Sequence, residues 1–538
     1  MWDEQVAAVC PVEHRSNATG QDQAVSAASP VPDSLTGLPV VLLSHRGPVS
    51  FDRDAATGDR TATRGAGGLV TALSGLAGHL DRAVWVCVAA QDEDVAVAQE
   101  AGGGSVRVVL DDPPLVVSDG DDASGRTVDL RLVEVPGPVH EAFYGTVANP
   151  LLWFLQHRLH SLATSPSFTR EDRAAFEDGY AEANRLAADA VVEQIEAVGG
   201  SAVVLLHDYH FYLVGDLVRQ RCADVLLSHF VHIPWPGPDA WRVLPPGVRE
   251  RLLEGLLGCD VVAFHTEADA RNFLLCVQEL LGLLVDLKQM EVRVGPRRVR
   301  ARAYPISIDV DALEETAHSV SADEHLAALD AQLGDAQLLL RVDRTDPSKN
   351  IVRGFTAYEL LLDEHPELHG SVVFLAMLQP SRQDVPEYAQ YLADIGAAAA
   401  QVNARFGTAE WQPVDLRLAS DMALAAAAYR RCDVLVVNAV ADGMNLVTKE
   451  AVVVNERAMV LALSEATGAH EELGRFAVTL HPFDVAQQAD ALHEALTAPA
   501  EARRDRHRLA AEVVRRNDVR RWLAVQLDEL GALAAARR

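Results

Sequence analysis

Short apolar runs alternate with amphipathic segments along most of the chain. The runs are rich in Val, Leu and Ile, which is typical of strands that a parallel sheet buries on both faces. In the first half they predict strands at 39–43, 202–206, 225–232, 260–264 and 300–306. In the second half they predict strands at 337–342, 371–378, 433–437, 459–463 and 477–480.

The segments between these runs repeat their apolar residues with the period of a helix. One long helical pattern covers 170–198, and those of the second half fall at 352–364, 387–405, 422–431, 446–455 and 486–496. Strands that alternate with helices predict an α/β fold with two doubly wound, Rossmann-like sheets. Such sheets bind ligands beyond the carboxyl ends of their strands, so we expect the chemistry in loops that follow strands.

The polar segment 317–334 separates the two series and is the predicted boundary between domains. We expect a flexible tail at 1–38, a first domain at 39–316, a second at 335–500 and a helical stretch at 501–538. The tail is polar and lacks the apolar core of a signal peptide. The helical stretch is rich in Arg and either stays exposed or crosses back onto the first domain.

Composition narrows the class of protein. The 538 residues include 47 basic and 77 acidic side chains, a net charge of −30, which opposes binding to nucleic acid. No apolar run reaches the ~18 residues that a membrane span needs, so we expect no membrane association. The six cysteines form no CxxC pair, which favours reduced thiols, a cytoplasmic protein and no zinc site. The oligomeric state, a homo-oligomer included, stays open.

Lysine is unusually scarce. Only Lys288, Lys349 and Lys449 accompany the many arginines. In such a background a lysine suggests a place where a compact ammonium fits and a planar guanidinium does not. Two of the three lie in loops that are expected to line a cleft, whereas Lys288 has no such assignment.

The strand predicted at 337–342 leads directly into a charged loop, 343–350. This loop carries Arg344 and Lys349 and is followed by a helix, whose N-terminus adds partial positive charge. Two cations there could neutralise a diphosphate. The alternative is a surface loop with solvated charges, but any cation would then serve, and lysine is rare in this chain.

A second loop, 442–450, follows the strand predicted at 433–437. Gly443 allows a tight turn, and the amides at the start of the next helix form a nest for phosphate or sugar oxygens. Glu450 falls about two turns into that helix, where it could accept hydrogen bonds from ribose hydroxyls. The alternative for Glu450 is an exposed carboxylate paired with an arginine.

Loops in the first half carry weaker signals. Arg46 follows the first strand, and Gly68 lies in a Gly-Gly-Leu that either approaches a phosphate or simply caps a helix. The segment 207–210, which includes Asp208, and His232 end adjacent strands and could form a metal site, but no HExxH or carboxylate cluster accompanies them. Core or capping roles are therefore the favoured alternative for His207 and His210. Tyr144 and Trp153 have the spacing of packed helical residues, and Arg382 follows the strand predicted at 371–378, where it could bind an anion.

Together these residues resemble the trehalose-6-phosphate synthases, retaining glycosyltransferases of the GT-B fold, in which two Rossmann-like domains face a cleft. The resemblance runs from about Val40 to Trp522. Its motifs, in the family's order, are 44–46, 67–69, Tyr144, Asn149, Leu152, Trp153, 207–210, 232–236, 343–349, 381–382 and 442–450.

The resemblance implies a role for each candidate residue, and neither a metal nor a cofactor. The implied catalytic residues are Arg344, Lys349, His232 and Asp208. The implied donor-binding residues are Gly68, Asp442, Gly443, Met444, Asn445, Leu446 and Glu450. The implied acceptor-binding residues are Arg46, Tyr144, Trp153 and Arg382, with Asp208 also at the acceptor.

The implied reaction moves glucose from a nucleoside diphosphate glucose to glucose 6-phosphate, giving α,α-trehalose 6-phosphate. In this family the leaving diphosphate assists the acceptor hydroxyl on the same face of the sugar, which requires positioning and charge stabilisation rather than a nucleophile. The resemblance does not indicate which base the donor carries.

Several positions depart from the family pattern. Trp85 is followed by Val-Cys-Val where Phe-Gly-Trp is usual, and His45 stands where Asn is usual. The diphosphate loop has Thr345 and Asn350 in place of Leu and Gly. These departures also resemble pseudo-glycosyltransferases, which join a nucleotide-activated cyclitol to an aminocyclitol phosphate through a C–N bond. That reaction is the alternative to glucosyl transfer.

Overall fold

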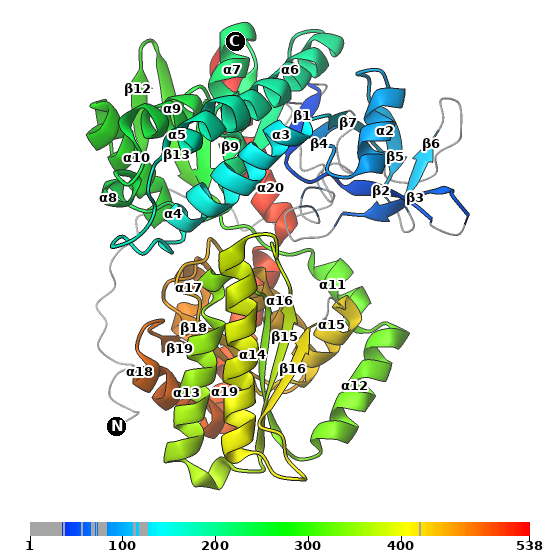
Figure 1. The fold of residues 1–538 in the computed structure, drawn as a ribbon, viewed down its shortest axis with the longest axis vertical. Helices are drawn as coiled ribbons and strands as arrows, with labels where there is room; N and C mark the ends of the chain where they lie inside the picture. Colours follow the sequence, from blue (N-terminus) through cyan, green and yellow to red (C-terminus); the bar gives the residue numbers. More distant parts are fainter. Residues whose placement is uncertain are drawn as a thin grey trace.

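The computed structural model describes residues 38–54, 57–65, 83–110, 114–117, 127–418 and 421–537, together with Leu35, Val70 and Leu73. Nearly all of the tail predicted at 1–38, and also Gly68, lie outside the described residues. Figure 1 shows two α/β bodies, one above the other, with helices covering the faces of each sheet.

The second half of the chain forms a six-stranded, fully parallel sheet in the order β16-β15-β14-β17-β18-β19. Its strands are β14 (Gln337–Arg344), β15 (Val372–Gln379), β16 (Val414–Leu418), β17 (Val434–Val437), β18 (Val460–Ser464) and β19 (Val478–Leu480). In chain order this is 3-2-1-4-5-6, the doubly wound arrangement. The order reverses between β14 and β17, where such a sheet opens a crevice for ligands.

The first half forms an eleven-stranded sheet in the order β11-β12-β13-β10-β9-β8-β1-β4-β7-β5-β6. Seven central strands run parallel: β1 (Val40–Ser44), β4 (Ala83–Val88), β7 (Thr127–Val133), β8 (Val203–His207), β9 (Leu226–Phe230), β10 (Val261–Phe264) and β13 (Arg297–Ala303). Antiparallel strands extend both edges: β5 (Val106–Val109), β6 (Leu115–Val117), β11 (Val285–Asp286) and β12 (Glu291–Val294). This order reverses between β1 and β8. A separate hairpin joins β2 (Val49–Arg53) and β3 (Arg60–Arg64).

Helices connect the strands of both sheets. Those of the first body are α2 (Asp92–Glu100), α3 (Gly137–His140), η1 (Glu141–Trp153), α4 (Phe154–Gln156), α5 (Arg170–Ala174), η2 (Ala175–Ala181), α6 (Glu182–Ala197), η3 (Tyr209–Phe211), α7 (Val214–Arg221), α8 (Pro238–Trp241), α9 (Pro246–Leu257) and α10 (Glu267–Leu281). The rest are α11 (Val310–Ala317), α12 (Val320–Leu333), η4 (Pro347–Lys349), α13 (Ile351–Glu364), η5 (Pro366–Leu368), α14 (Pro386–Phe406), α15 (Met422–Arg431), α16 (Leu446–Val454), α17 (Ala469–Leu473), η6 (Gly474–Phe476), α18 (Val485–Thr497), α19 (Ala500–Arg516) and α20 (Val519–Arg537). None of the helices in the described parts is long and apolar enough to span a membrane.

The α/β fold with two doubly wound sheets is confirmed. Each of the ten predicted strands is present, with ends that shift by at most three residues. The prediction omits three parallel strands, β4 and β7 of the first sheet and β16 at the edge of the second, and also all the strands that pair only antiparallel, which are β2, β3, β5, β6, β11 and β12. β4 is entirely buried and apolar like the predicted strands, whereas β7 alternates buried residues with partly exposed ones such as Asp129 and Arg131, because it borders the antiparallel edge.

The chain passes from the first sheet to the second at 304–309, between β13 and α11. The polar segment 317–334 contributes α12, which packs against α15 of the second body. The chain returns at 517–519, where the Val519 amide donates to the carbonyl of Ile308 at 3.0 Å. From there α20 runs up against the first sheet, as the red helix in Figure 1 shows, and Trp522 packs on Phe230 of β9.

Candidate active site

Both points where the strand order reverses carry predicted site residues. In the second sheet, Arg344 is the last residue of β14, Lys349 follows this strand, and Asp442 follows β17. In the first sheet, Arg46 follows β1 and Asp208 follows β8. The carboxyl ends of parallel strands share one edge of a sheet, so each pair of loops meets at the crevice of its own sheet.

Arg382 joins the two bodies at this place. It lies beyond β15, yet its Nη2 donates to the hydroxyl of Tyr209 in the first body at 3.2 Å. Its Nη1 donates to the hydroxyl of Tyr388 on α14 at 2.6 Å. The guanidinium also lies 4.1 Å above the ring of Trp153, a cation–π contact. The predicted acceptor residues Arg382 and Trp153 are therefore in direct contact, although they come from different bodies.

A buried carboxylate, Asp346, balances the arginines of this cluster. Its side chain is 0% exposed and lies 2.5 Å from Nη2 of Arg344 and 3.9 Å from Nη1 of Arg382. Neither carboxylate oxygen accepts a well-aligned hydrogen bond. Burial by itself would raise the pKa of Asp346, but Arg344, Arg382 and Lys349 outweigh it and hold that pKa below its usual value.

Lys349 forms the second ion pair of the cleft. Its Nζ lies 2.5 Å from Oδ2 of Asp442 and 3.9 Å from Oδ1 of Asp343. Burial opposes the charge, but the two carboxylates outweigh it and raise the pKa of Lys349. The charged form of Asp343 is less stabilised, because burial raises its pKa to about 6 despite the nearby Lys349 and Arg341. The pair joins the loops after β14 and β17, so the predicted diphosphate and donor-sugar loops are in contact.

In the donor loop, the residue with unusual backbone dihedrals is not Gly443, at which a tight turn was expected. The residue with a left-handed backbone is Asn445, at φ 75°, whose side chain accepts from the Thr448 amide and caps α16. Gly443 is required for a different reason. A Cβ at that position would lie 2.4 Å from the carbonyl oxygen of His232, so the loop passes directly against the first body.

The other donor-loop residues are packed close by. Met444 is buried and Leu446 is partly buried. Glu450 accepts a hydrogen bond from the hydroxyl of Tyr429 at 3.0 Å, and burial raises its pKa. The alternative of an exposed carboxylate paired with arginine is therefore wrong for Glu450.

On the acceptor side, a hydrogen-bonded chain fixes the aromatic wall. The Tyr209 hydroxyl donates to the Asn149 side chain at 2.9 Å, and Asn149 in turn donates to the Tyr144 carbonyl at 3.0 Å. Trp153 is nearly buried, and its indole N–H has no hydrogen-bond partner. Arg46 is exposed at the rim.

His45 is the centre of a stack of rings behind Arg46. It lies between Tyr144, at 4.8 Å between ring centroids, and His210, at 4.4 Å, with nearly parallel planes in both contacts. Burial, with the nearby His140, Arg46 and Arg382, lowers the pKa of His45 to about 3, so its imidazole is neutral. The residues 86–88, where the sequence departs from the family pattern, lie in β4 itself, and the Val88 amide donates to the His45 carbonyl.

Asp208 and His232 meet where the first body faces the second. Asp208 has φ 73°, rare for a residue with a side chain, and accepts from the His232 amide at 3.3 Å. Burial raises the pKa of Asp208 to about 6. The two histidines suspected of binding metal instead contact one another, with Nδ1 of His207 3.1 Å from Nε2 of His232.

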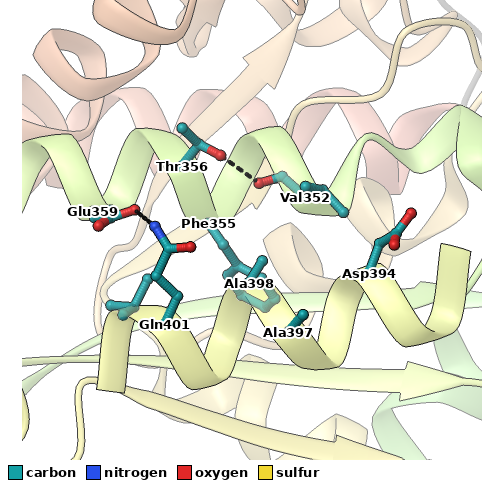
Figure 2. Close-up of a pocket in the computed structure, with 9 residues that line it drawn as sticks. Val352, Phe355, Thr356, Glu359, Asp394, Ala397, Ala398 and Gln401 are labelled. Carbon is teal, nitrogen blue, oxygen red and sulfur yellow. Dashed lines mark hydrogen bonds between the residues drawn. The ribbon is translucent and has the colours of Figure 1, made fainter. Parts of the chain in front are cut away.

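Within the described residues, the group that has the spacing of metal ligands is His365, Glu367 and His493, at the far end of α13. The 14 residues of α13 place it about 20 Å from Lys349. A groove of about 250 Å³ lies between α13 and α14. Figure 2 shows residues that line it, among which Gln401 donates to Glu359. No predicted site residue lines that groove.

Several residues of the cleft are absent from the predicted site. Tyr209, Tyr388, Asp343 and Asp346 all contact predicted residues. The two aspartates lie inside the predicted diphosphate loop, one on each side of Arg344 in the sequence, which was the available signal. Tyr388 carried no signal, because one aromatic residue in a helical pattern is indistinguishable from a core residue.

The family model of glycosyltransferase family 20 matches residues 39–532. The chain belongs to this family, and it is a glycosyltransferase. It is 34% identical over 401 residues to a bifunctional trehalose-6-phosphate synthase/phosphatase of Thermoproteus tenax, which covers 74% of this chain and 53% of that protein. The chain thus spans about half the length of that relative.

Two further family members match nearly the whole chain. A validamine 7-phosphate valienyltransferase of Streptomyces hygroscopicus subsp. jinggangensis is 30% identical over 504 residues, which are 94% of this chain and 96% of that protein. The crystal structure of a UDP-forming α,α-trehalose-phosphate synthase from Burkholderia xenovorans, in complex with glucose 6-phosphate, superposes with a TM-score of 0.76. Its identity is 26%, and the match covers 91% of this chain and 99% of that one.

Replacing Asp346 by Asn tests the charge balance of the cleft. Because the pKa of Asp346 lies below the unfolded value of about 3.9, its stabilising contribution is complete at neutral pH. Removing a buried partner leaves Arg344 and Arg382 close together without their carboxylate, so we expect a loss of about 3 kcal/mol in the free energy of unfolding in urea at pH 7.5. Asp394→Asn, at an exposed position of α14, is the control and should change it by less than about 0.5 kcal/mol. Equal stability of the two variants would contradict the charge-balance account.

Proposed function

We propose that the protein transfers glucose, with retention, from a nucleoside diphosphate glucose to glucose 6-phosphate, and so forms trehalose 6-phosphate. The observation that carries the proposal is a pair of cation sites at one cleft, Lys349 with Arg344 and Arg382 with Arg46. Asp346 lies between two of these cations, 2.5 Å from Arg344 and 3.9 Å from Arg382. A reaction between a diphosphate sugar and a phosphorylated acceptor needs such a pair of anion sites.

On the donor side, Arg344 and Lys349 would bind the diphosphate. Both cations are already paired with carboxylates, so the diphosphate would replace Asp442 at Lys349 and Asp346 at Arg344. Glu450, oriented by Tyr429, would accept the ribose hydroxyls. Asp442, released from Lys349, and the amides of Gly443, Met444, Asn445 and Leu446 would hold the sugar opposite His232.

On the acceptor side, Arg382 and Arg46 would bind the phosphate of glucose 6-phosphate, and Trp153 and Tyr144 would form the wall. Tyr209 and Tyr388 hold the Arg382 guanidinium through two hydrogen bonds, so its orientation is set before the ligand binds. Asp208, next to His232, would accept a hydroxyl of the acceptor. The structure solved for the Burkholderia xenovorans relative in complex with glucose 6-phosphate supports this acceptor class.

The chemical step would then rely on positioning and charge. As the glycosidic bond breaks, negative charge grows on the diphosphate, where Arg344 and Lys349 stabilise it. The acceptor hydroxyl attacks from the same face and its proton passes to the leaving phosphate oxygen. No side chain has to become a nucleophile, which suits a cleft whose histidines are held neutral by burial.

A second candidate is the pseudo-glycosyltransferase reaction, in which an activated cyclitol is joined to an aminocyclitol phosphate through a C–N bond. The valienyltransferase that matches 94% of this chain supports it. So does His45, because a neutral imidazole in the acceptor wall can accept a hydrogen bond from an amine as well as from a hydroxyl.

The two candidates are separated by a donor and acceptor screen. The purified protein is supplied with UDP-, GDP- or ADP-glucose and glucose 6-phosphate, and release of the nucleoside diphosphate is measured together with the product. Trehalose 6-phosphate formed with any of the donors supports the proposal. No turnover with any sugar donor, together with turnover of a nucleotide-activated cyclitol and an aminocyclitol phosphate, would replace it with the second candidate.

Nucleotide binding tests the donor cations directly. We expect Arg344→Ala and Lys349→Ala each to weaken binding of UDP or GDP by about 1.5–3 kcal/mol in titration calorimetry. The loss should be larger for Lys349→Ala, because it leaves Asp442 unpaired beside the diphosphate. Arg405→Ala is the control, since its partners Glu359 and Asp363 lie on α13, outside the cleft. Equal binding by all three variants would remove Arg344 and Lys349 from the donor site.

The pH profile of kcat/KM for the acceptor tests Asp208. Its pKa of about 6 means that acidification below pH 6 removes the carboxylate that would bind the acceptor. The phosphate of the acceptor titrates near the same pH, so the wild-type logarithmic profile should fall with a slope of about two. Asp208→Asn should lower activity and reduce that slope to about one. An unchanged slope would show that Asp208 does not bind the acceptor as a carboxylate.

A further inference from the structure

Lys449 does not reach the cleft, although its place in the donor loop suggested that it would. Its side chain on α16 is 1% exposed. The Nζ donates to the carbonyl of Ile306 at 2.8 Å and to Oε2 of Glu472 at 2.6 Å. A buried ammonium is costly unless it is fully paired, so these two contacts account for its presence there.

The Ile306 contact ties Lys449 to the segment that connects the two bodies. Ile306 belongs to the crossing at 304–309, after β13. Its amide faces Nδ1 of His265 at 3.5 Å, and two residues later the Ile308 carbonyl accepts from Val519 of the second crossing. Lys449 of the second body therefore holds the segment 304–309, where the chain first passes between the bodies. That segment is in turn hydrogen-bonded to 517–519, where the chain returns.

The Glu472 contact ties Lys449 to the donor loop. Glu472 lies on α17, whose first residues hold that loop through their backbone. The Gly468 amide donates to the Asp442 carbonyl at 3.0 Å, and the Ala469 amide donates to the Met444 carbonyl at 2.9 Å. The ion pair of Lys449 and Glu472 therefore joins α16 to α17 and holds the donor loop between these two helices.

The first body leaves little room for this loop to move. A Cβ on Gly443 would lie 2.4 Å from the His232 carbonyl oxygen and 3.1 Å from the ring of His265. Trp522 packs beside the same strand end, with ring centroids 5.4 Å from Phe230 and 6.4 Å from His232. A shift of the crossing would consequently move the donor loop against His232.

We propose that Lys449 is a positioning residue that fixes how the two domains meet. It holds the crossing segment against the donor-loop helix, so that Lys349 and Asp442 face His232 across the cleft. Lys449 itself touches no substrate. The effect of Lys449 on turnover rests on the proposed function. Its structural role, which is to connect the segment 304–309 to the donor loop, does not. The site favours lysine, because a compact ammonium fits between one carbonyl and one carboxylate where a planar guanidinium needs more room.

The test replaces the buried pair with apolar side chains of similar length. Lys449→Met alone leaves the carboxylate of Glu472, which is only 15% exposed, without this partner and risks destabilising the fold, so Lys449→Met combined with Glu472→Met is the main variant. Lys288→Met is the matched control, since Lys288 is exposed on a turn of the first body. Folding is checked by circular dichroism before any comparison.

Hydrogen exchange and nucleotide binding provide readouts that do not depend on turnover. In the double variant we expect amide exchange at 306–308 and at Val519 to accelerate by about tenfold or more, since the tie to Ile306 is gone. The Kd for UDP or GDP should stay within about twofold, because Arg344 and Lys349 are unchanged. Unchanged exchange in the crossings of a folded double variant would overturn the proposal.

Turnover adds the functional readout. With the donor that the wild-type protein uses, we expect kcat to fall by about tenfold or more, with donor KM changed by less than about threefold, because the loop is bound but misplaced. Lys449→Arg should not restore kcat, and Lys288→Met should match the wild type. A kcat within twofold of wild type in the double variant would overturn the positioning role. If the wild-type protein turns over no sugar donor, the proposed function fails. The hydrogen-exchange measurement then still tests whether Lys449 holds the segment at Ile306.

Discussion

Pairing of buried charge is the constraint on which the cleft depends. Arg344 and Arg382 both lie over the ring of Trp153, at 5.5 and 4.1 Å, and would repel one another without Asp346 beneath them. Lys349 likewise needs Asp442. Asp346 with Arg382 joins the loops after β14 and β15, and Lys349 with Asp442 joins those after β14 and β17, so the interactions that balance the charges also set the shape of the cleft. A ligand phosphate that replaces a carboxylate meets cations that are already in place.

Close backbone approach is the second constraint, and it connects the cleft to the domain junction. The donor loop has no room for a side chain at Gly443, and neither does the start of α17 at Gly468, where a Cβ would lie 1.9 Å from the Gly443 carbonyl oxygen. The first body presses on one side of the loop and α17 on the other. Lys449 connects this loop to the crossing at Ile306, so donor site and junction form one packed unit.

The net charge of −30 and the proposed binding of phosphates are compatible because the two act at different ranges. Beyond about 10 Å, salt screens the field of the surface, whereas a buried cation acts on a phosphate at contact distance. The scarce lysines illustrate how local the requirement is. Lys349 lies in the cleft, Lys449 lies at the junction, and Lys288 is exposed on a turn.

The sequence by itself determined the two doubly wound sheets, since apolar runs and helical periods are local patterns that the chain carries in order. It also determined which loops hold the cations, because loops after parallel strands meet at one edge of a sheet. Only the tertiary structure decided the partners: Asp346 for two arginines, Tyr429 for Glu450, and Ile306 with Glu472 for Lys449. Most of these partners are about 20 to 140 residues from the group they hold. Such contacts depend on how sheets and crossings pack in space, which no local pattern of residues encodes.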